Sequence, residues 1–217
     1  LEIFACSASA YVWTVEEIGA LETGESEATT LHLKSATSIT LSGKLFGASV
    51  TLTATGLEGV GTKLGANGTD SGAWKLKGTT ISAPNCKVSP ETIETKALKG
   101  ELTKVGTTLY DKIVPAEGTT LATFSIVGAS CTVAGTGFEL TGTLYAQVEP
   151  VETELVEQPL EFSPTIESAA GGTLNLSGEK AKFTMSARME VVPPARKIAA
   201  LPAAPKYQQG AYGAGRS

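Results

Sequence analysis

Apolar and polar side chains alternate along much of this chain with a period of two residues. The run 37–42, for example, places Ile39 and Leu41 on one face and polar side chains on the other. Such alternation is typical of β-strands that have one buried face and one face in water. On this basis we predict further strands over residues 11–15, 29–34, 49–54, 73–77, 79–82, 91–98, 101–105, 107–113, 120–127, 137–148, 173–177 and 181–189.

Glycine and proline mark the breaks between these strands. Residues 56–72 hold six glycines and are predicted to form a loop region. The acidic stretch 149–167 is interrupted by three prolines, which lack a backbone donor and belong at sheet edges or in loops. The segment Ala83-Pro84-Asn85 is the predicted hinge between two lobes.

The strand pattern predicts an all-β fold in which antiparallel sheets stack as a β-sandwich, in two lobes with an extended C-terminal arm. We expect an N-terminal β lobe over residues 1–84 and a C-terminal β lobe over residues 85–192. Residues 193–217 are rich in Pro, Ala and Gly, and such sequence cannot bury enough surface to fold alone. These residues are therefore the predicted arm.

Composition and charge argue against several classes of partner. Only 18% of the residues are charged, and Thr and Ser carry much of the polarity, which suits half-buried strands. The net charge of −5 and the isoelectric point near 5.1 argue against nucleic acid as a partner. No run of 18 apolar residues occurs, so no membrane span is predicted. Because no signal peptide is visible and the chain starts at Leu1, we expect a mature, processed or truncated product.

The three cysteines bear on the compartment. Cys86 and Cys131 flank a β-patterned stretch and are predicted to form a disulfide, which favours an oxidising compartment. In the chain-entropy model, closing a loop of this length stabilises the fold by about 4 kcal/mol. The alternative is two separate buried thiols. Cys6 is left over, either as a buried thiol, which we favour, or for a bond to another chain.

Several stretches carry a resemblance to known proteins. They are Asn85-Cys-Lys-Val88, the run 90–102, the run 109–118, Ser130-Cys-Thr-Val-Ala-Gly-Thr136, Thr143-Leu-Tyr145, the region 13–25 and the run 41–52. Together these stretches resemble a group of secreted, β-rich proteins of soil actinobacteria of the Thermoleophilia type. The resemblance covers roughly residues 11–190 and leaves out the C-terminal arm.

The resemblance implies export and a β fold. We therefore expect a secreted, extracellular protein at the cell surface. It implies no activity, because no chemistry is assigned to the group. Members of the group often carry one further cysteine after the Val50-Thr-Leu52 run and another near Thr79-Thr80. This chain has neither. If that second pair forms a crosslink in the relatives, the crosslink is missing here.

The only histidine, His32, is a poor candidate for catalysis. It lies between Leu31 and Leu33, so alternation predicts that it faces water on the opposite side of its strand. A lone histidine cannot build a zinc cluster with other His or Cys ligands. No Gly-x-Ser-x-Gly motif is present to supply a nucleophilic serine beside it.

The remaining polar residues form no recognisable catalytic or binding set. Asp70 is expected in a turn, and Asp111 on a strand or at its end. The run 59–65 is rich in glycine but lacks the Gly-Lys-Ser/Thr ending of a phosphate loop. We therefore expect no enzyme activity, no metal site and no cofactor. The least favoured alternative is a hydrolase that uses two of the glutamates Glu94, Glu101, Glu139 and Glu161, which solvent-facing positions explain more simply.

The predicted arm has the opposite charge to the rest of the chain. It contains four basic residues and no acidic one, whereas the remainder carries a net charge of −9. An acidic neighbouring subunit would attract such a segment. The alternative is an arm that packs on its own body. The residues that we expect to dock on a neighbour are Arg196, Lys197, Lys206, Tyr207, Tyr212 and Arg216.

These features favour a non-enzymatic extracellular structural protein. It would be a subunit of a fibre, sheath or similar assembly, in which an extended segment of one copy pairs with an open sheet edge of the next. Its expected partners are copies of itself, with surface polysaccharide as a further candidate. The alternative is a secreted adhesion module that binds carbohydrate or another ligand through exposed aromatic rings. The candidate rings are those of Tyr11, Trp74, Tyr110 and Tyr145.

Overall fold

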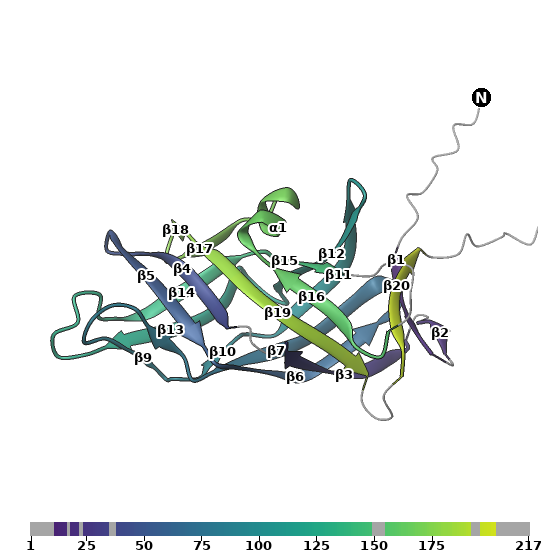
Figure 1. Ribbon diagram of the computed structural model, residues 1–217, viewed down its shortest axis with the longest axis horizontal. Helices are drawn as coiled ribbons and strands as arrows, with labels where there is room; N and C mark the ends of the chain where they lie inside the picture. The colour runs from purple at the N-terminus through teal and green to yellow at the C-terminus, as the bar shows by residue number, and fades with distance from the viewer. Residues whose placement is uncertain are drawn as a thin grey trace, which may run out of the picture.

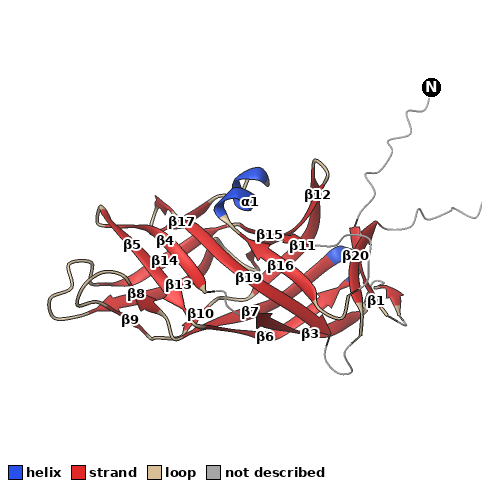
Figure 2. Ribbon diagram, viewed as in Figure 1, coloured by secondary structure: helices blue, strands red, loops and turns tan. Residues whose placement is uncertain are grey.

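The computed structural model describes residues 11–16, 18–21, 24–34, 38–148, 155–191 and 196–202. These residues fold almost entirely into antiparallel β-strands (Figure 2), which confirms the predicted all-β, antiparallel class. The first part of the chain forms β1 (Tyr11–Val15), β2 (Gly19–Ala20), β3 (Ser26–Leu33), β4 (Ile39–Leu45), β5 (Ala48–Ala54), β6 (Gly56–Gly65), the 3-10 turn η1 (Ala66–Gly68), β7 (Thr69–Lys77), β8 (Thr80–Ile81), β9 (Lys87–Ser89) and β10 (Ile93–Glu94). The second part forms β11 (Leu98–Val105), β12 (Thr108–Pro115), β13 (Thr120–Val127), β14 (Gly135–Gly142), β15 (Leu144–Val148), β16 (Gln158–Phe162), α1 (Pro164–Ala169), β17 (Leu174–Leu176), β18 (Glu179–Lys180), β19 (Lys182–Val191) and β20 (Ile198–Pro202).

Eight of the strands close into a barrel-like ring. In the order β16, β15, β12, β11, β7, β6, β3 and β19, each strand pairs with the next, and β19 pairs back with β16. Closure leaves the ring with no open edge along these pairings. Because β3, β6 and β7 precede Asn85 and the other five strands follow it, the two predicted lobes share one sheet.

The inside of the ring is a packed core. Side chains that alternate along the strands fill it, and Leu64, Ala146, Met185 and Ala187 are almost completely buried. A cavity of about 30 Å³ lies between the strands. It has room for about two or three water molecules, because one water needs roughly 10–15 Å³ on this measure. The ring is therefore filled by its own side chains, as in small barrels that carry no ligand.

The strand β19 joins the ring to a second group of sheets. Its later residues pair with β3 and β16 in the ring, whereas Lys182, Phe183 and Thr184 pair with β4. The strand β4 continues through β5 to β8, and this layer contacts a separate five-stranded sheet in the order β18, β17, β14, β13, β9. Rings from the two layers meet where Phe46 and Phe138 pack edge to face, with centroids 5.9 Å apart. The result is an elongated molecule (Figure 1).

A three-stranded sheet of β2, β1 and β20 lies at the other end of the molecule, on the right in Figure 1. The strand β1 contacts η1 and β11 of the ring. It buries the Trp13 and Val15 side chains completely. This sheet joins the first and last described strands of the chain, and we call it the terminal sheet.

The glycine-rich stretch 56–72, predicted as a loop, instead forms β6, η1 and the start of β7. The reason is close packing around Thr62, whose hydroxyl donates to the Thr29 carbonyl oxygen at 2.5 Å. A Cβ added to Gly72 would lie 2.6 Å from Thr62 Cγ2, so only glycine allows this approach. Gly59 and Gly72 thus serve strand packing around Thr62.

Two other segments also differ from the sequence prediction. The run 137–148, expected as one strand, is broken at Thr143 into β14 and β15, which belong to different sheets. The acidic, proline-punctuated stretch contains the helix α1. Ser163 caps this helix by accepting a hydrogen bond from the Ile166 N–H at 3.2 Å, and Pro164 occupies its first turn. These are standard start signals of a helix.

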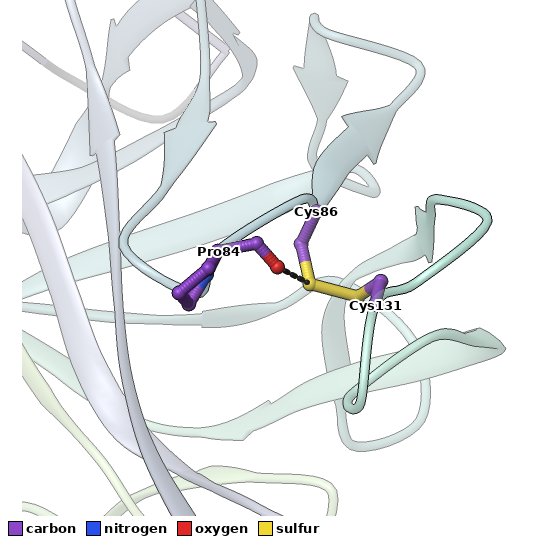
Figure 3. The surroundings of a disulfide bond; sticks show 3 residues. All are labelled: Pro84, Cys86 and Cys131. Atoms are coloured by element: carbon purple, nitrogen blue, oxygen red, sulfur yellow. Dashed lines mark hydrogen bonds between the residues drawn. A yellow bond between two sulfur atoms is a disulfide. The ribbon is translucent and has the colours of Figure 1, made fainter.

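Cys86 and Cys131 are joined by the predicted disulfide (Figure 3). Their Cα atoms lie 4.9 Å apart, and the Pro84 carbonyl oxygen lies 3.3 Å from Cys86 Sγ. Cys86 precedes β9 and Cys131 lies between β13 and β14, so the bond ties a connecting segment to the five-stranded sheet. Cys6 lies outside the described residues.

Candidate assembly interface

The terminal sheet is built from two segments that are far apart in sequence. All five residues of β1 pair with β20, from Tyr11 opposite Pro202 to Val15 opposite Ile198. The Thr14 hydroxyl adds a hydrogen bond to the Ala199 carbonyl oxygen at 3.2 Å. The strand β20 is held because its run Ile198-Ala-Ala200 is completely buried.

Ion pairs fix the chain just before β20. The Arg196 guanidinium lies 2.8 Å from a Glu27 carboxylate oxygen, with both side chains about one-fifth exposed. Lys197 Nζ lies 3.3 Å from the Glu16 carboxylate, which also accepts a hydrogen bond from the Lys197 backbone N–H at 3.1 Å. These contacts from Lys197 lower the pKa of Glu16. Two of the four basic residues of the predicted arm thus pair with acids of their own chain.

The predicted docking residues therefore fall into two groups. Arg196 and Lys197 contact the body of the same chain, as the alternative of a self-packed arm had proposed. The other four, Lys206, Tyr207, Tyr212 and Arg216, lie outside the described residues. The segment 203–217 retains a charge of +2, whereas residues 1–202 contain 15 basic and 22 acidic residues. A charge contrast thus persists beyond Pro202.

The pairing of Tyr11 with Pro202 has a geometric consequence. It places the points at which segments 1–10 and 203–217 join the fold side by side, at one end of the elongated body. Figure 1 shows β5 and β9 toward the opposite end of the body. The strand β8, which pairs with β5, and the strand β9 are the outer strands of their sheets. One end of the body thus carries the points at which both terminal segments join the fold, and the outer strands β8 and β9, which contact each other, lie toward the other end.

The lone histidine lies on the wet face of its strand, as predicted. His32 Nε2 lies 2.7 Å from a Glu190 carboxylate oxygen on the neighbouring strand β19, and about half of the His32 side chain is exposed. Such an exposed pair contributes about 0–1 kcal/mol to stability.

The glutamates of the hydrolase alternative are distributed over four strands. Glu94 on β10 pairs with Lys75 at 3.0 Å, and Glu161 on β16 pairs with Lys34 at 3.2 Å. Glu101 and Glu139 are exposed on β11 and β14. Nothing in these contacts joins two of the four into a carboxylate pair.

The aromatic rings of the binding-module alternative do not form an exposed platform. Trp74 and Tyr110 are buried, and they pack edge to face against Phe162 and Tyr145. Tyr11 is half-buried and lies under the Lys104 ammonium group, 5.6 Å from its ring centre. Because two of the four rings belong to the core, a flat sugar-stacking surface is not assembled from them.

Among the described residues, no three His, Cys, Asp or Glu side chains gather closely enough to hold a metal ion. Within the same ranges, no helix has the length and apolar character needed to cross a membrane. No protein-family model, curated protein or solved structure matches the chain.

One feature of the sequence indicated that β20 belongs to the fold, although the composition of the surrounding residues suggested a free arm. The run Ile198-Ala-Ala-Leu201 is apolar, although the prolines and glycines around it are typical of an extended arm. An apolar run of this kind needs another element to cover it. In the structure β1, which was predicted as a strand and contains Trp13, pairs with it. The pairing joins residues about 185 positions apart, which no local pattern indicates.

Proposed function

We propose that this protein is a non-enzymatic, extracellular structural subunit that assembles with copies of itself. The terminal segments 1–10 and 203–217 of one copy would dock on the opposite end of the next copy. The observation that carries the proposal is the pairing of β1 with β20, since it places the points at which both segments join the fold at one end of an elongated body. An extended segment that adds to an open sheet edge is a common mode of such docking.

The body of the molecule suits a structural subunit better than an enzyme. The ring is packed, its cavity of about 30 Å³ admits no organic ligand, and the disulfide ties down the far end. We further infer that the β4–β5–β8 layer and the five-stranded sheet act as a β-sandwich that extends the barrel-like ring. The disulfide and the resemblance to secreted actinobacterial proteins support an extracellular location.

Charge supports docking between copies. The segment 203–217 carries +2, whereas residues 1–202 carry an excess of seven acidic residues. Attraction between these parts would steer one copy toward the next and would weaken as salt is added. The carbohydrate-binding alternative gains no comparable support, because Trp74 and Tyr110 are core residues.

The test compares the full chain with a chain that ends at Pro202. This cut keeps β20 and its ion pairs, whereas a cut after Val191 would also remove part of the fold. By sedimentation velocity and electron microscopy, we expect the full chain to form oligomers or filaments. The chain ending at Pro202 should stay folded by circular dichroism but remain monomeric.

A full-length variant with Lys206→Glu and Arg216→Glu separates charge from length. We expect weaker assembly than for the matched Lys206→Arg and Arg216→Lys variant, which keeps both charges. A natural chain that stays monomeric at every concentration would contradict the proposal. Undiminished assembly of the chain ending at Pro202 would contradict the role of the C-terminal segment.

A further inference from the structure

The two aspartates of the chain meet inside the ring, although they are 41 positions apart. Asp70 lies on β7 and Asp111 on β12, with β11 between them. Paired residues of neighbouring antiparallel strands point to the same face of the sheet. Following the pairings across the strands gives two rows of side chains on the face that carries the aspartates. The first row runs Leu64, Asp70, Gly100, Ile113 and Leu144, and the second runs Leu102, Asp111 and Ala146. The apolar members of both rows are buried, so both aspartates lie on the core side of the sheet, Asp111 buried and Asp70 partly exposed.

Gly100 creates the space in which the two carboxyl groups approach. It is paired with Asp70 on one side and Ile113 on the other. A Cβ added at Gly100 would overlap both carboxylate oxygens of Asp70. The Asp70 carboxylate therefore lies directly over this glycine and reaches across β11 toward β12. A larger residue at position 100 would push it back.

The two carboxyl groups interact with each other, and each has one buried oxygen that lacks a donor. Oδ2 of Asp70 and Oδ1 of Asp111 are buried and meet no hydrogen-bond donor among the described residues. The carboxyl groups are nevertheless within hydrogen-bonding reach of each other, and the Glu101 backbone N–H donates to Asp111. Two bare carboxylates would repel in this position, whereas one proton makes one group the donor and the other the acceptor.

Lys63 lines the same cavity as the two aspartates, and Lys99 and Lys112 line a surface hollow with Asp70, but no lysine or arginine among the described residues lowers the pKa of either aspartate. The residues of β3, β16 and β19 that line the same cavity are Thr29, Leu31, Leu160 and Met189. The charged residues on the adjoining strands are exposed: Lys63 on β6, Lys99 and Glu101 on β11, and Lys112 on β12. The hydroxyl of Thr62 is already used by the Thr29 carbonyl oxygen.

A metal ion fits this place poorly. Calcium needs six to eight oxygen ligands, and magnesium keeps an octahedral shell with several waters. The two aspartates are the carboxylates present, and the adjoining cavity of about 30 Å³ holds about two or three waters. A proton needs only the two carboxyl groups themselves.

We propose that Asp70 and Asp111 hold one proton between them at neutral pH and form a pH-sensitive lock in the wall of the ring. Loss of the proton leaves two charges in contact within the wall and loosens it. Leu102, the partner of Asp111 in its row, also lies against Gly68, over which Tyr11 of the terminal sheet passes. The lock therefore adjoins the terminal sheet. This inference does not depend on the proposed assembly.

The direction of the pH effect follows from the surroundings. Burial raises the pKa of Asp70 to about 6, against an ordinary value of 3.8. Burial, and next the charge of Asp70, raise the pKa of Asp111 well above 3.8. The native state thus binds more protons than the unfolded state above about pH 4. Stability that is fully present below about pH 4 should fall as pH rises through about 6 and beyond.

The composition of the chain permits a direct test on the natural protein. Because it contains two aspartates, labelling aspartate with ¹³C at Cγ yields two carboxyl signals for NMR titration. We expect both signals to respond to the same two protonation steps, at least one of them well above the ordinary range, as in a coupled pair. Two independent titrations near pH 4 would overturn the proposal.

Variants give a second readout. Asp70→Asn and Asp111→Asn should each raise the melting temperature at pH 8 more than at pH 4, whereas the exposed control Glu139→Gln should keep the natural pH profile. Gly100→Ala, which displaces Asp70, should uncouple the two NMR titrations. The titration and melts are repeated with millimolar Ca²⁺ or Mg²⁺. If either ion stabilises the natural chain and Asp70→Asn abolishes that stabilisation, the pair is a cation site. That result would overturn the shared proton.

Discussion

Single residues hold the terminal sheet against the ring, and Gly68 is the clearest case. It adopts a left-handed conformation with φ of +73°, and a Cβ there would overlap the Tyr11 carbonyl oxygen. Gly61 also has a positive φ, of +59°, but a Cβ there would meet nothing within 4 Å. The two glycines share the backbone strain and differ only in the contact.

We therefore predict different costs for two alanine substitutions. Gly61→Ala should lower the free energy of unfolding by about 1–2 kcal/mol, which is the cost of the left-handed conformation. Gly68→Ala should cost about 1–3 kcal/mol more, because it also overpacks against Tyr11. Denaturant melts of the two variants measure the difference. Equal losses would mean that the contact between η1 and β1 is not close in solution.

The disulfide makes a prediction of the same kind. Replacing both Cys86 and Cys131 by Ser releases a loop of 45 residues and should lower the free energy of unfolding by about 4 kcal/mol. Chemical denaturation of the double variant measures this loss. The natural chain unfolded in the presence of a reductant should match it. A loss under about 1 kcal/mol would indicate that the unfolded chain is already constrained without the bond.

Some residue-level features followed directly from the sequence. Alternation alone placed His32 on the wet face, and the β-patterned stretch between the two cysteines led to the predicted disulfide. The contact between Asp70 and Asp111 could not be predicted in the same way. It depends on the register of β7, β11 and β12 and on Gly100 standing between them. Asp70 was expected in a turn because the glycines around it are typical of turns.

At the level of elements, β20 determines whether the C-terminal region belongs to the fold. Its burial predicts that a chain ending at Val191 loses the packing of Ile198, Ala199 and Ala200 and exposes Trp13. The loss should be at least about 3 kcal/mol, since burying one large aliphatic side chain is worth about 1.5–3 kcal/mol. Thermal melts of chains ending at Val191 and at Pro202 measure it. Equal melting temperatures would show that β20 contributes nothing.

Strands were easier to predict than their partners. The alternation found β4, β5, β12 and β13 nearly within their observed bounds, because each has one buried and one wet face. It could not show that β14 and β15 belong to different sheets, since the break at Thr143 changes the direction of the chain and not its hydrophobicity. It also missed β6, where glycines occupy strand positions beside Thr62.

At the scale of the whole molecule, ring closure is the feature that local sequence could not reveal. A sandwich and a closed ring use the same alternating strands, and the difference lies in whether β19 pairs back with β16. The pairing of the two ends of the chain is equally non-local. It converts a segment that looks like a free arm into a strand of the fold, and it moves the start of the proposed docking segment to the residue after Pro202.

The most direct test of the assembly proposal is a reconstruction of the assembled protein by electron microscopy. The proposal predicts copies arranged end to end along the long axis of the body, with the terminal sheet of one copy facing the β8–β9 end of the next. Density for a terminal segment should run along that neighbouring end. Copies packed side by side, with their terminal sheets away from any neighbour, would contradict the proposal.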